Sequence, residues 1–243
     1  MIGLGTIVNA AAILAGGAAG LALKRVIPKR VTDTVMQGVG LAVVIVGISG
    51  ALKAAFTVAG EGIESDHILL MIVALAVGAL IGELLKLENR LEAFGKFCER
   101  KLTKPGSDST FTQGFVTATL VYCVGAMAIV GSLEDGMNRN HDILFAKSAL
   151  DGISAIVFAS AMGMGVLFSA VTVGLYQGTI TLLSVVVAPY LNDLVVTQMS
   201  LIGSVLILSI GLNMLGIAKI KVGNLLPAVF VPVVYHGIRL LAG

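Results

Sequence analysis

The sequence predicts an all-α fold, a polytopic transmembrane helical bundle, and three observations support this prediction. Hydrophobic residues make up 57% of the 243 residues and charged residues only 12%, whereas a soluble domain carries roughly a quarter charged residues. Apolar stretches on the order of 20 residues, long enough to cross about 30 Å of hydrocarbon, recur along the chain. These stretches are continuous instead of alternating, which disfavours a β-barrel. We therefore expect one transmembrane domain over residues 1–243.

Apolar length defines the individual spans. About eight are expected (seven to eight), at residues 4–23, 33–53, 67–86, 111–132, 143–162, 166–189, 197–217 and 222–241. The fifth and sixth are separated best at Met162-Gly163-Met164-Gly165, because a break at Gln177-Gly178 would leave one span too long and one too short. No basic residue precedes the first span, unlike a cleaved secretory signal, so we expect this segment to remain in the protein.

The basic residues of the connections predict the orientation. On one side lie Lys24, Arg25, Lys29 and Arg30, then Arg90, Lys96, Arg100, Lys101 and Lys104, and then Lys219 and Lys221; the other side carries little beyond Lys53, Arg139 and Arg239. Because lysine and arginine favour the cytoplasmic side, both termini are expected outside a prokaryotic cell (inner) membrane.

The longest cytoplasmic connection, residues 87–110, divides the chain into halves at 1–104 and 110–243. Leu87, Leu91, Phe94 and Cys98 recur at helical spacing with charged residues between them. This pattern fits an amphipathic helix on the inner membrane surface, with basic residues near anionic headgroups. It fits equally well an extension of the third span that packs on its neighbours. Pro105-Gly106-Ser107 would end the helix as a linker.

An internal repeat is a further hypothesis. Residues 36–52 in the second span and 199–215 in the seventh share glycine-spaced aliphatic sequence. Spans one to three and six to eight would then be an inverted repeat, as in many transporters. Chance similarity between helices rich in glycine, leucine and valine is the alternative.

Lys147 and Asp151 are the most informative residues. Asp151 would lie roughly 12 Å into the hydrocarbon, with Lys147 one turn nearer the outer surface and on the same helix face. The two side chains could form a self-neutralised structural pair. Alternatively, Asp151 lines a polar path and binds a cation or a proton, because an ionisable group at this depth is costly unless it faces a cavity or a partner.

Other polar residues are weaker candidates for the same path. Asn9 and Gln177 lie well inside apolar helices, where a hydrogen bond across a helix contact is the simpler role. Glu83 precedes Lys86 by three residues and favours an interfacial ion pair, and Asn213 sits similarly near the end of the seventh span. His236 is typical of an interfacial hydrogen bonder, with proton relay as the alternative.

Two features of the backbone and the charges suggest a cavity. Pro227 and Pro232 each remove a helix hydrogen bond in the eighth span and can bend or break it. Glu134 and Asp135 follow the fourth span, where an acidic pair at an outer mouth would concentrate cations, although a solvated helix end is equally ordinary. The pairs Gly16 with Gly20, Gly78 with Gly82, and Gly174 with Gly178 predict close helix packing or dimerisation.

The sequence contains no catalytic constellation. It has three histidines but no HExxH or Gly-x-Ser-x-Gly motif. The two cysteines, Cys98 and Cys123, have no metal-ligand spacing. We therefore expect no enzyme activity, cofactor, metal site or nucleic-acid partner.

Four motifs resemble a known family. GTIVNAAAILAGGAAG from Gly5, YCVGAMAIVGSLEDG from Tyr122, KSALDG from Lys147 and NLLPA from Asn224 together are similar to the YqgA/YdfK-like bacterial and archaeal membrane proteins, a family of unknown function. The resemblance covers essentially the whole chain and implies a multi-span cell-membrane protein. It implies no substrate and assigns no role to Lys147 or Asp151.

The sequence therefore favours a transporter or channel for a small solute or ion, with Asp151 as its central ionisable group. A homodimer is a reasonable oligomeric state because the small-residue faces allow close helix contact. The alternative is a non-transporting scaffold or partner subunit in which Lys147 and Asp151 pair structurally.

Overall fold

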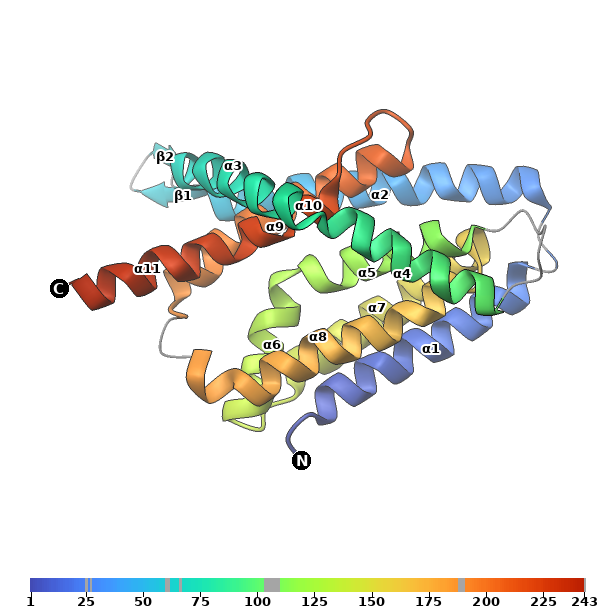
Figure 1. Ribbon diagram of the computed structural model, residues 1–243, viewed down its shortest axis with the longest axis horizontal. Helices are drawn as coiled ribbons and strands as arrows, with labels where there is room; N and C mark the ends of the chain where they lie inside the picture. Colours follow the sequence, from blue (N-terminus) through green and yellow to red (C-terminus); the bar gives the residue numbers. More distant parts are fainter. Residues whose placement is uncertain are drawn as a thin grey trace. The chain divides into compact units, whose positions relative to one another are not determined.

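The computed structural model describes residues 1–24, 26, 28–59, 62–65, 67–102, 110–187 and 191–242, and the described chain is almost entirely helical (Figure 1). The elements are α1 (Leu4–Lys24), α2 (Lys29–Ala55), β1 (Phe56–Ala59), β2 (Gly62–Ser65), α3 (Ile68–Leu85), α4 (Leu87–Leu102), α5 (Phe111–Val124), α6 (Ala126–Met137), α7 (Asp142–Met162), α8 (Gly165–Val187), α9 (Asp193–Met214), α10 (Val222–Leu225), the 3-10 helix η2 (Leu226–Phe230) and α11 (Val231–Ala242). The predicted all-helical class is confirmed. The sequence did not predict the antiparallel hairpin in which Phe56 of β1 pairs with Ser65 of β2.

Six helices of the described chain are long and apolar enough to cross a membrane, and a bent pair raises the number to seven. They are Leu4–Lys24, Arg30–Ala55, Ile68–Leu85, Asp142–Met162, Gly165–Val186 and Asp193–Met214. The predicted break between the fifth and sixth spans is confirmed, because α7 ends at Met162 and α8 begins at Gly165. Gly163 lies between them with a φ of 83°, a conformation that glycine adopts without steric cost.

Two of the expected spans differ from a single continuous helix. Residues 111–132 were expected as one span, but α5 and α6 are bent by 60° and α6 continues to Met137. Gly125 separates the two helices, and a glycine weakens a helix interior. Residues 222–241 are divided among α10, η2 and α11. Pro227 lies in η2 and Pro232 in the first turn of α11, so the predicted interruption by proline is confirmed.

Some predicted features lie outside the described residues. They are the linker Pro105-Gly106-Ser107 and the basic residues Arg25 and Lys104. The division of the chain into halves at the connection 87–110 therefore stays a prediction.

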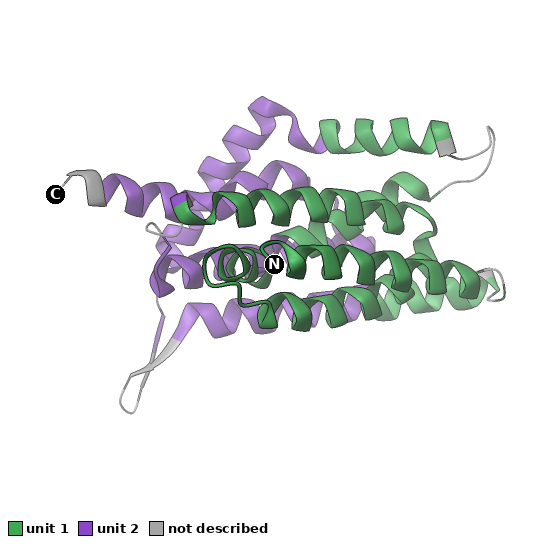
Figure 2. Cartoon of the chain, turned by 90° about the horizontal axis from the view of Figure 1, so that it is seen from below, with its two compact units in different colours: residues 1–39, 89–123, 127–185 green, residues 40–88, 124–126, 186–243 purple. Residues whose placement is uncertain are grey.

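The chain forms two compact units that do not follow the order of the sequence (Figure 2). Unit 1 contains residues 1–39, 89–123 and 127–185, and unit 2 contains residues 40–88, 124–126 and 186–243. Each unit is built from helices that are far apart along the chain. The packing within each unit decides which polar side chains meet.

Unit 1 is organised by the close packing of α1 on α7. A Cβ atom at Gly16 would overlap the carbonyl oxygen of Gly152, and one at Gly20 would overlap the carbonyl oxygen of Ile156. The predicted use of Gly16 and Gly20 for close helix approach is thus confirmed. α8 also lies against α1, because a Cβ at Gly17 would collide with the side chain of Leu167.

The contacts of unit 1 also define its two ends. At one end, the backbone N–H groups of Gly3 and Gly5 donate to the Asp135 carboxylate. At the other end, Lys24 donates to the carbonyl oxygen of Ala161, and a Cβ at Gly165 would overlap the carbonyl oxygen of Phe111. We call these the Asp135 end and the Lys24 end.

Unit 2 uses glycines in the same way. α3 packs on the broken segment of α10 and η2, because Cβ atoms at Gly78 and Gly82 would overlap the backbone of Ala228 and Asn224. The predicted role of this glycine pair in close packing is also confirmed. The third pair behaves differently: a Cβ at Gly178 would meet nothing within 4 Å, and one at Gly174 would touch only Ala10 at 3.9 Å.

Candidate functional site

Lys147 and Asp151 form an ion pair in the interior of unit 1. Both lie on one face of α7, four residues apart, and the Lys147 Nζ atom is 2.6 Å from Asp151 Oδ2. Only 5% of Lys147 and 6% of Asp151 is exposed. Asp151 is nine residues from the start of α7 at Asp142, which corresponds to about 13 Å along the helix axis. The pair is therefore buried by protein and lies deep in a candidate span.

Two amide side chains from other helices complete the cluster. Asn9 of α1 donates from Nδ2 to Asp151 Oδ2 at 3.0 Å and to Gln177 Oε1 of α8 at 3.2 Å. Both Asn9 and Gln177 are fully buried. Three helices thus bring together four residues that the sequence nominated as candidates for a polar path. We call Asn9, Lys147, Asp151 and Gln177 the polar cluster.

The orientation of the two amides follows from the carboxylate. Rotating the Asn9 amide would place its oxygen against the oxygen of Asp151, and rotating Gln177 would place two N–H₂ groups against each other. The observed arrangement leaves Asn9 Oδ1 and Gln177 Nε2 without a hydrogen-bond partner. A buried polar atom in this state costs about 1–3 kcal/mol. The cluster therefore presents one acceptor and one donor that a small polar ligand could use.

A tyrosine borders the cluster. Tyr122 of α5 is fully buried, and the Ser154 hydroxyl donates to its hydroxyl oxygen at 3.4 Å. The Lys147 Nζ atom lies 5.9 Å from the centre of the Tyr122 ring, within the range of a cation–π contact. Lys147 is therefore held between a carboxylate and an aromatic face.

Further unpartnered hydroxyls lie between the cluster and the Asp135 end. Thr6 precedes Asn9 by three residues on α1, and Thr181 follows Gln177 by four residues on α8, so each is about one turn away. Both Oγ1 atoms are buried without a hydrogen-bond partner. The buried polar groups of α1 and α8 therefore continue from the cluster toward one end of unit 1.

Asp135 and His141 lie at that end. Asp135 is fully buried and accepts hydrogen bonds from the N–H groups of Gly3 and Gly5, both at 3.0 Å. His141 Nδ1 lies 2.9 Å from Asp135 Oδ1, although the pair lacks the geometry of a hydrogen bond. Glu134 instead accepts from Asn138, the residue directly after the end of α6, at 2.9 Å. The two neighbouring carboxylates thus have different partners, and Asp135 caps the first turn of α1.

The half of unit 1 toward the Lys24 end is mainly apolar. Its buried side chains include Ile13, Phe115, Phe158, Met162, Val166 and Val173. Ser160 and Ser169 bond to backbone carbonyls of their own helices, and among the described residues of this half only the Thr119 hydroxyl lacks a partner. Unit 1 therefore has a polar half and an apolar half.

Three other sequence candidates lie in unit 2, apart from this cluster. Glu83 bonds to Lys221 at 3.0 Å and to Asn224 at 2.6 Å, where the sequence suggested a pair with Lys86. Asn213 holds a loop by bonding to both the N–H and the carbonyl of Ile220. These contacts stabilise local structure.

His236 takes part in a second unit 2 network. Its Nε2 atom is 3.0 Å from Gln198 Oε1, and Gln198 Nε2 is 3.3 Å from His67 Nδ1. We did not single out His67, Gln198, Asn224 or His141 from the sequence. Gln198 lies inside an apolar helix, so the signal that identified Gln177 could also have identified it.

No group of three or more His, Cys, Asp and Glu side chains among the described residues could hold a metal ion. The chemistry of the polar cluster is that of one carboxylate, one ammonium group and two amides. These side chains can bind a proton, a small cation or a small polar solute, and they can form hydrogen bonds with the bound species.

Helices long enough to cross a membrane, with a buried ionisable cluster between them, define a helical membrane protein with multiple spans. The chain belongs to the family described as "Protein of unknown function (DUF554)", whose model matches residues 4–236. This agrees with the resemblance found in the sequence motifs.

Two relatives align over most of the chain. The chain is 34% identical over 228 residues to the "Uncharacterized membrane protein YdfK" of Bacillus subtilis, which covers 94% of this chain and 93% of the relative. It is 30% identical over 228 residues to the "Uncharacterized protein YqgA" of Escherichia coli, covering 93% of this chain and 92% of the relative. No solved structure matches the chain.

Proposed function

We propose that this membrane protein is a transporter or channel that moves a proton or a small ion or solute through unit 1, with Asp151 as the central ionisable group. One observation carries the proposal. Asp151 is buried deep in a candidate span and accepts a hydrogen bond from Asn9, which also donates to Gln177. Each of these two amides keeps one buried atom without a hydrogen-bond partner.

The cost of this arrangement supports a functional role. A buried ion pair is weak evidence for stability, because well-packed hydrophobic residues of similar volume are often as stable or more so. Ionisable residues inside spans usually mark ion or proton pathways. Asn9 Oδ1 and Gln177 Nε2 are buried without a hydrogen-bond partner, which further lowers the stability of the folded protein. A cluster that served packing alone would not require this cost.

The cluster favours a small cargo. The Lys147 ammonium group pairs with Asp151 Oδ2, so it occupies the position that a bound cation would take. A proton or a small cation would compete with Lys147 for this carboxylate. Binding would then release the lysine, and departure of the cargo would allow the ion pair to form again.

Proteoliposomes provide the test. The purified protein is reconstituted with a pH-sensitive dye inside, and ion gradients are imposed for protons, Na⁺ and K⁺ in turn. We expect Asp151→Asn to abolish the flux. The matched control is Asp142→Asn, which makes the same change at the exposed first residue of the same helix and should preserve it. Flux that is unchanged in Asp151→Asn would remove Asp151 from the pathway.

The alternative function is a non-transporting scaffold. It predicts that the double variant Lys147→Met/Asp151→Leu keeps both folding and assembly, whereas a pathway should lose its flux in this variant. The glycine pairs argue against this alternative, because Gly16 with Gly20 and Gly78 with Gly82 are used for packing within the chain. Of the predicted pairs, Gly174 with Gly178 is left for the proposed homodimer.

The orientation and the internal repeat are also proposals. We infer that both termini lie outside, which places the Asp135 end of unit 1 outside. Labelling of the cysteine of an Ile2→Cys variant in sealed cells, after replacement of Cys98 and Cys123, tests this orientation. An inverted repeat of the first three and last three spans would relate helices that cross in opposite directions. We further propose that the protein is not an enzyme and needs no cofactor.

A further inference from the structure

Helix α4 (Leu87–Leu102) has two chemically different faces. One set of its exposed side chains recurs at intervals of three and four residues and contains basic and aromatic groups without an acidic one. The set consists of Arg90, Ala93, Phe94, Phe97, Arg100 and Lys101. Phe94 is 50% exposed and Phe97 48% exposed. We call these six residues the basic aromatic face.

The opposite face of α4 contacts protein. Gly95 is buried against Thr112 and Phe115 of α5, and the Thr112 hydroxyl donates to the Glu99 carboxylate. Glu88 accepts a hydrogen bond from the N–H of Gly223, and Glu92 pairs with Lys96 at 3.3 Å. All three acidic side chains of α4 therefore have protein partners.

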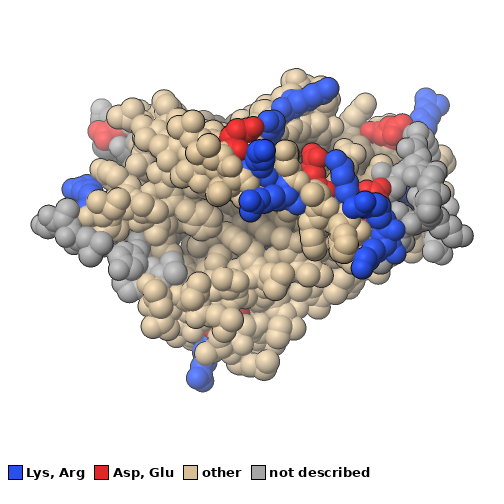
Figure 3. Space-filling view, in the orientation of Figure 1, with Lys and Arg blue, Asp and Glu red and all other residues tan. Residues whose placement is uncertain are grey.

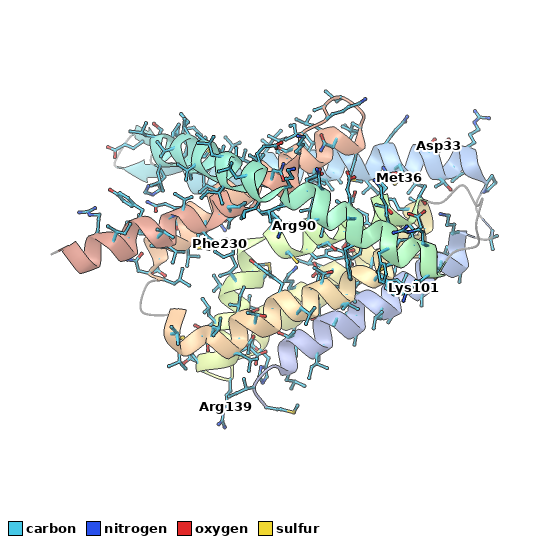
Figure 4. All side chains as sticks on the ribbon, in the orientation of Figure 1. Asp33, Met36, Arg90, Lys101, Arg139 and Phe230 are labelled. Carbon is cyan, nitrogen blue, oxygen red and sulfur yellow. The ribbon has the colours of Figure 1, made fainter. Side chains whose placement is uncertain are left out.

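The basic groups of the exposed face differ in this respect. Among the described residues, Arg90, Arg100 and Lys101 form no ion pair. Lys101 lies over the ring of Phe97, with Nζ 4.9 Å from its centre. Figure 3 shows lysine and arginine side chains gathered where Figure 1 draws α4, and Figure 4 labels Arg90 and Lys101 on this helix. The face thus carries uncompensated positive charge beside exposed aromatic surface.

The connection from α3 indicates where α4 begins relative to the membrane. α3 has 18 residues, which is about 27 Å and close to the thickness of the hydrocarbon. It ends at Leu85, Lys86 adopts a left-handed conformation with a φ of 52°, and α4 begins at Leu87. α4 therefore starts where the third candidate span reaches the headgroup region.

We propose that the basic aromatic face of α4 binds the phosphate groups of anionic phospholipids in the surrounding bilayer. Arg90, Arg100 and Lys101 would contact the phosphates, and Phe97 would insert at the boundary between headgroups and acyl chains. Positive charge is attracted to anionic headgroups, and aromatic rings favour this boundary. The packing of α4 on α5 and its contact with lipid are therefore properties of opposite faces of one helix.

The composition offers a sensitive probe, because the chain contains no tryptophan. Phe97→Trp gives a protein with one fluorophore on the proposed face. The protein is reconstituted in phosphatidylcholine with a small fraction of brominated phosphatidylglycerol or, separately, brominated phosphatidylcholine. We expect the anionic brominated lipid to quench the introduced tryptophan more strongly. The matched control is Phe230→Trp, because Phe230 in η2 is similarly exposed, at 43%. The two brominated lipids should quench a tryptophan at this position equally.

Charge removal completes the experiment. Each basic residue near an anionic surface changes affinity about fivefold, so Arg100→Gln and Lys101→Gln should each reduce the preference for the anionic lipid by about that factor. Equal quenching by both lipids would overturn the proposal. Absence of quenching by either lipid would also overturn it, and would indicate that protein covers this face.

A second measurement needs no tryptophan. Added phosphatidylglycerol should raise the thermal unfolding temperature of the natural protein in detergent more than added phosphatidylcholine does. The triple variant Arg90→Gln/Arg100→Gln/Lys101→Gln should lose this difference. A difference that persists in the triple variant would assign the anionic lipid to another part of the protein.

Discussion

The two units differ in whether their buried polar side chains have hydrogen-bond partners. In the part of the chain that the structure describes, the buried side-chain atoms without a hydrogen-bond partner are those of Thr6, Asn9, Thr119, His141, Gln177 and Thr181. All six residues belong to unit 1. Native proteins satisfy the large majority of such atoms, so their concentration in one unit needs an explanation.

Unit 2 shows the ordinary pattern. Asn224 accepts from the N–H of Glu88 at 2.7 Å and donates to Glu83 at 2.6 Å. Gln198 uses its oxygen toward His236 and its nitrogen toward His67. Each amide connects separate elements, and satisfied networks of this kind rigidify a fold. The comparison indicates that the hydrogen-bond networks of unit 2 stabilise its fold, whereas the atoms without partners in the polar cluster reduce the stability of unit 1.

The largest expected effect comes from breaking the charge pair in unit 1. Lys147→Met leaves the Asp151 carboxylate buried without its cation, and removal of one partner of a buried pair costs about 3–5 kcal/mol. We expect a large decrease in the thermal unfolding temperature, measured by scanning fluorimetry in detergent. The double variant Lys147→Met/Asp151→Leu should recover most of the loss. A stable single variant would mean that Asp151 is solvated or protonated in the folded protein.

Separating α1 from α7 should have the next largest effect. A methyl group at Gly16 would overlap the carbonyl oxygen of Gly152, and such overpacking costs about 1–3 kcal/mol. Gly16→Ala should therefore lower the unfolding temperature and weaken the contact of Asn9 with Asp151. Gly38→Ala is the matched control, because Gly38 also lies in a helix, α2, and its Cβ would meet nothing within 4 Å. Equal stability of the two variants would contradict the close approach of α1 and α7.

A pair of asparagine variants compares the units directly. Asn224→Leu leaves the Glu88 N–H and Glu83 without this partner, at a cost of about 1–3 kcal/mol. Asn9→Leu leaves Gln177 Oε1 without its donor, but it also removes Asn9 Oδ1, an acceptor without a partner, and leaves Asp151 paired with Lys147. We therefore expect Asn224→Leu to be the less stable variant by thermal unfolding and Asn9→Leu to be the less active in proteoliposomes. The reverse order would mean that unit 1 holds the structural network.

The sequence predicted the parts of the site that depend on local geometry. Lys147 and Asp151 are one turn apart on a helix, so their pairing follows from spacing alone. The break at Met162-Gly163-Met164-Gly165 follows similarly from span length and glycine. The sequence could not show that Asn9 contacts both Asp151 and Gln177, because this depends on the packing of α1 against α7 and α8. It also missed the bend beside Gly125, which differs little from other glycines in apolar helices.

The smallest expected change in stability is also the closest test of the polar half of unit 1. Thr181→Val replaces an unpartnered buried hydroxyl by a methyl group of similar shape. Because no protein hydrogen bond is lost, we expect the free energy of unfolding to change by no more than about 0.5 kcal/mol. If cargo reaches Asp151 from the Asp135 end, the same variant should slow the flux in proteoliposomes, because it removes a polar group about one turn from Gln177. The matched control is Thr179→Val, which lies on the same helix but is exposed. If Thr181→Val has unchanged flux while Asp151→Asn has none, the route to the cluster does not pass Thr181, and its unfilled hydroxyl has no role in transport.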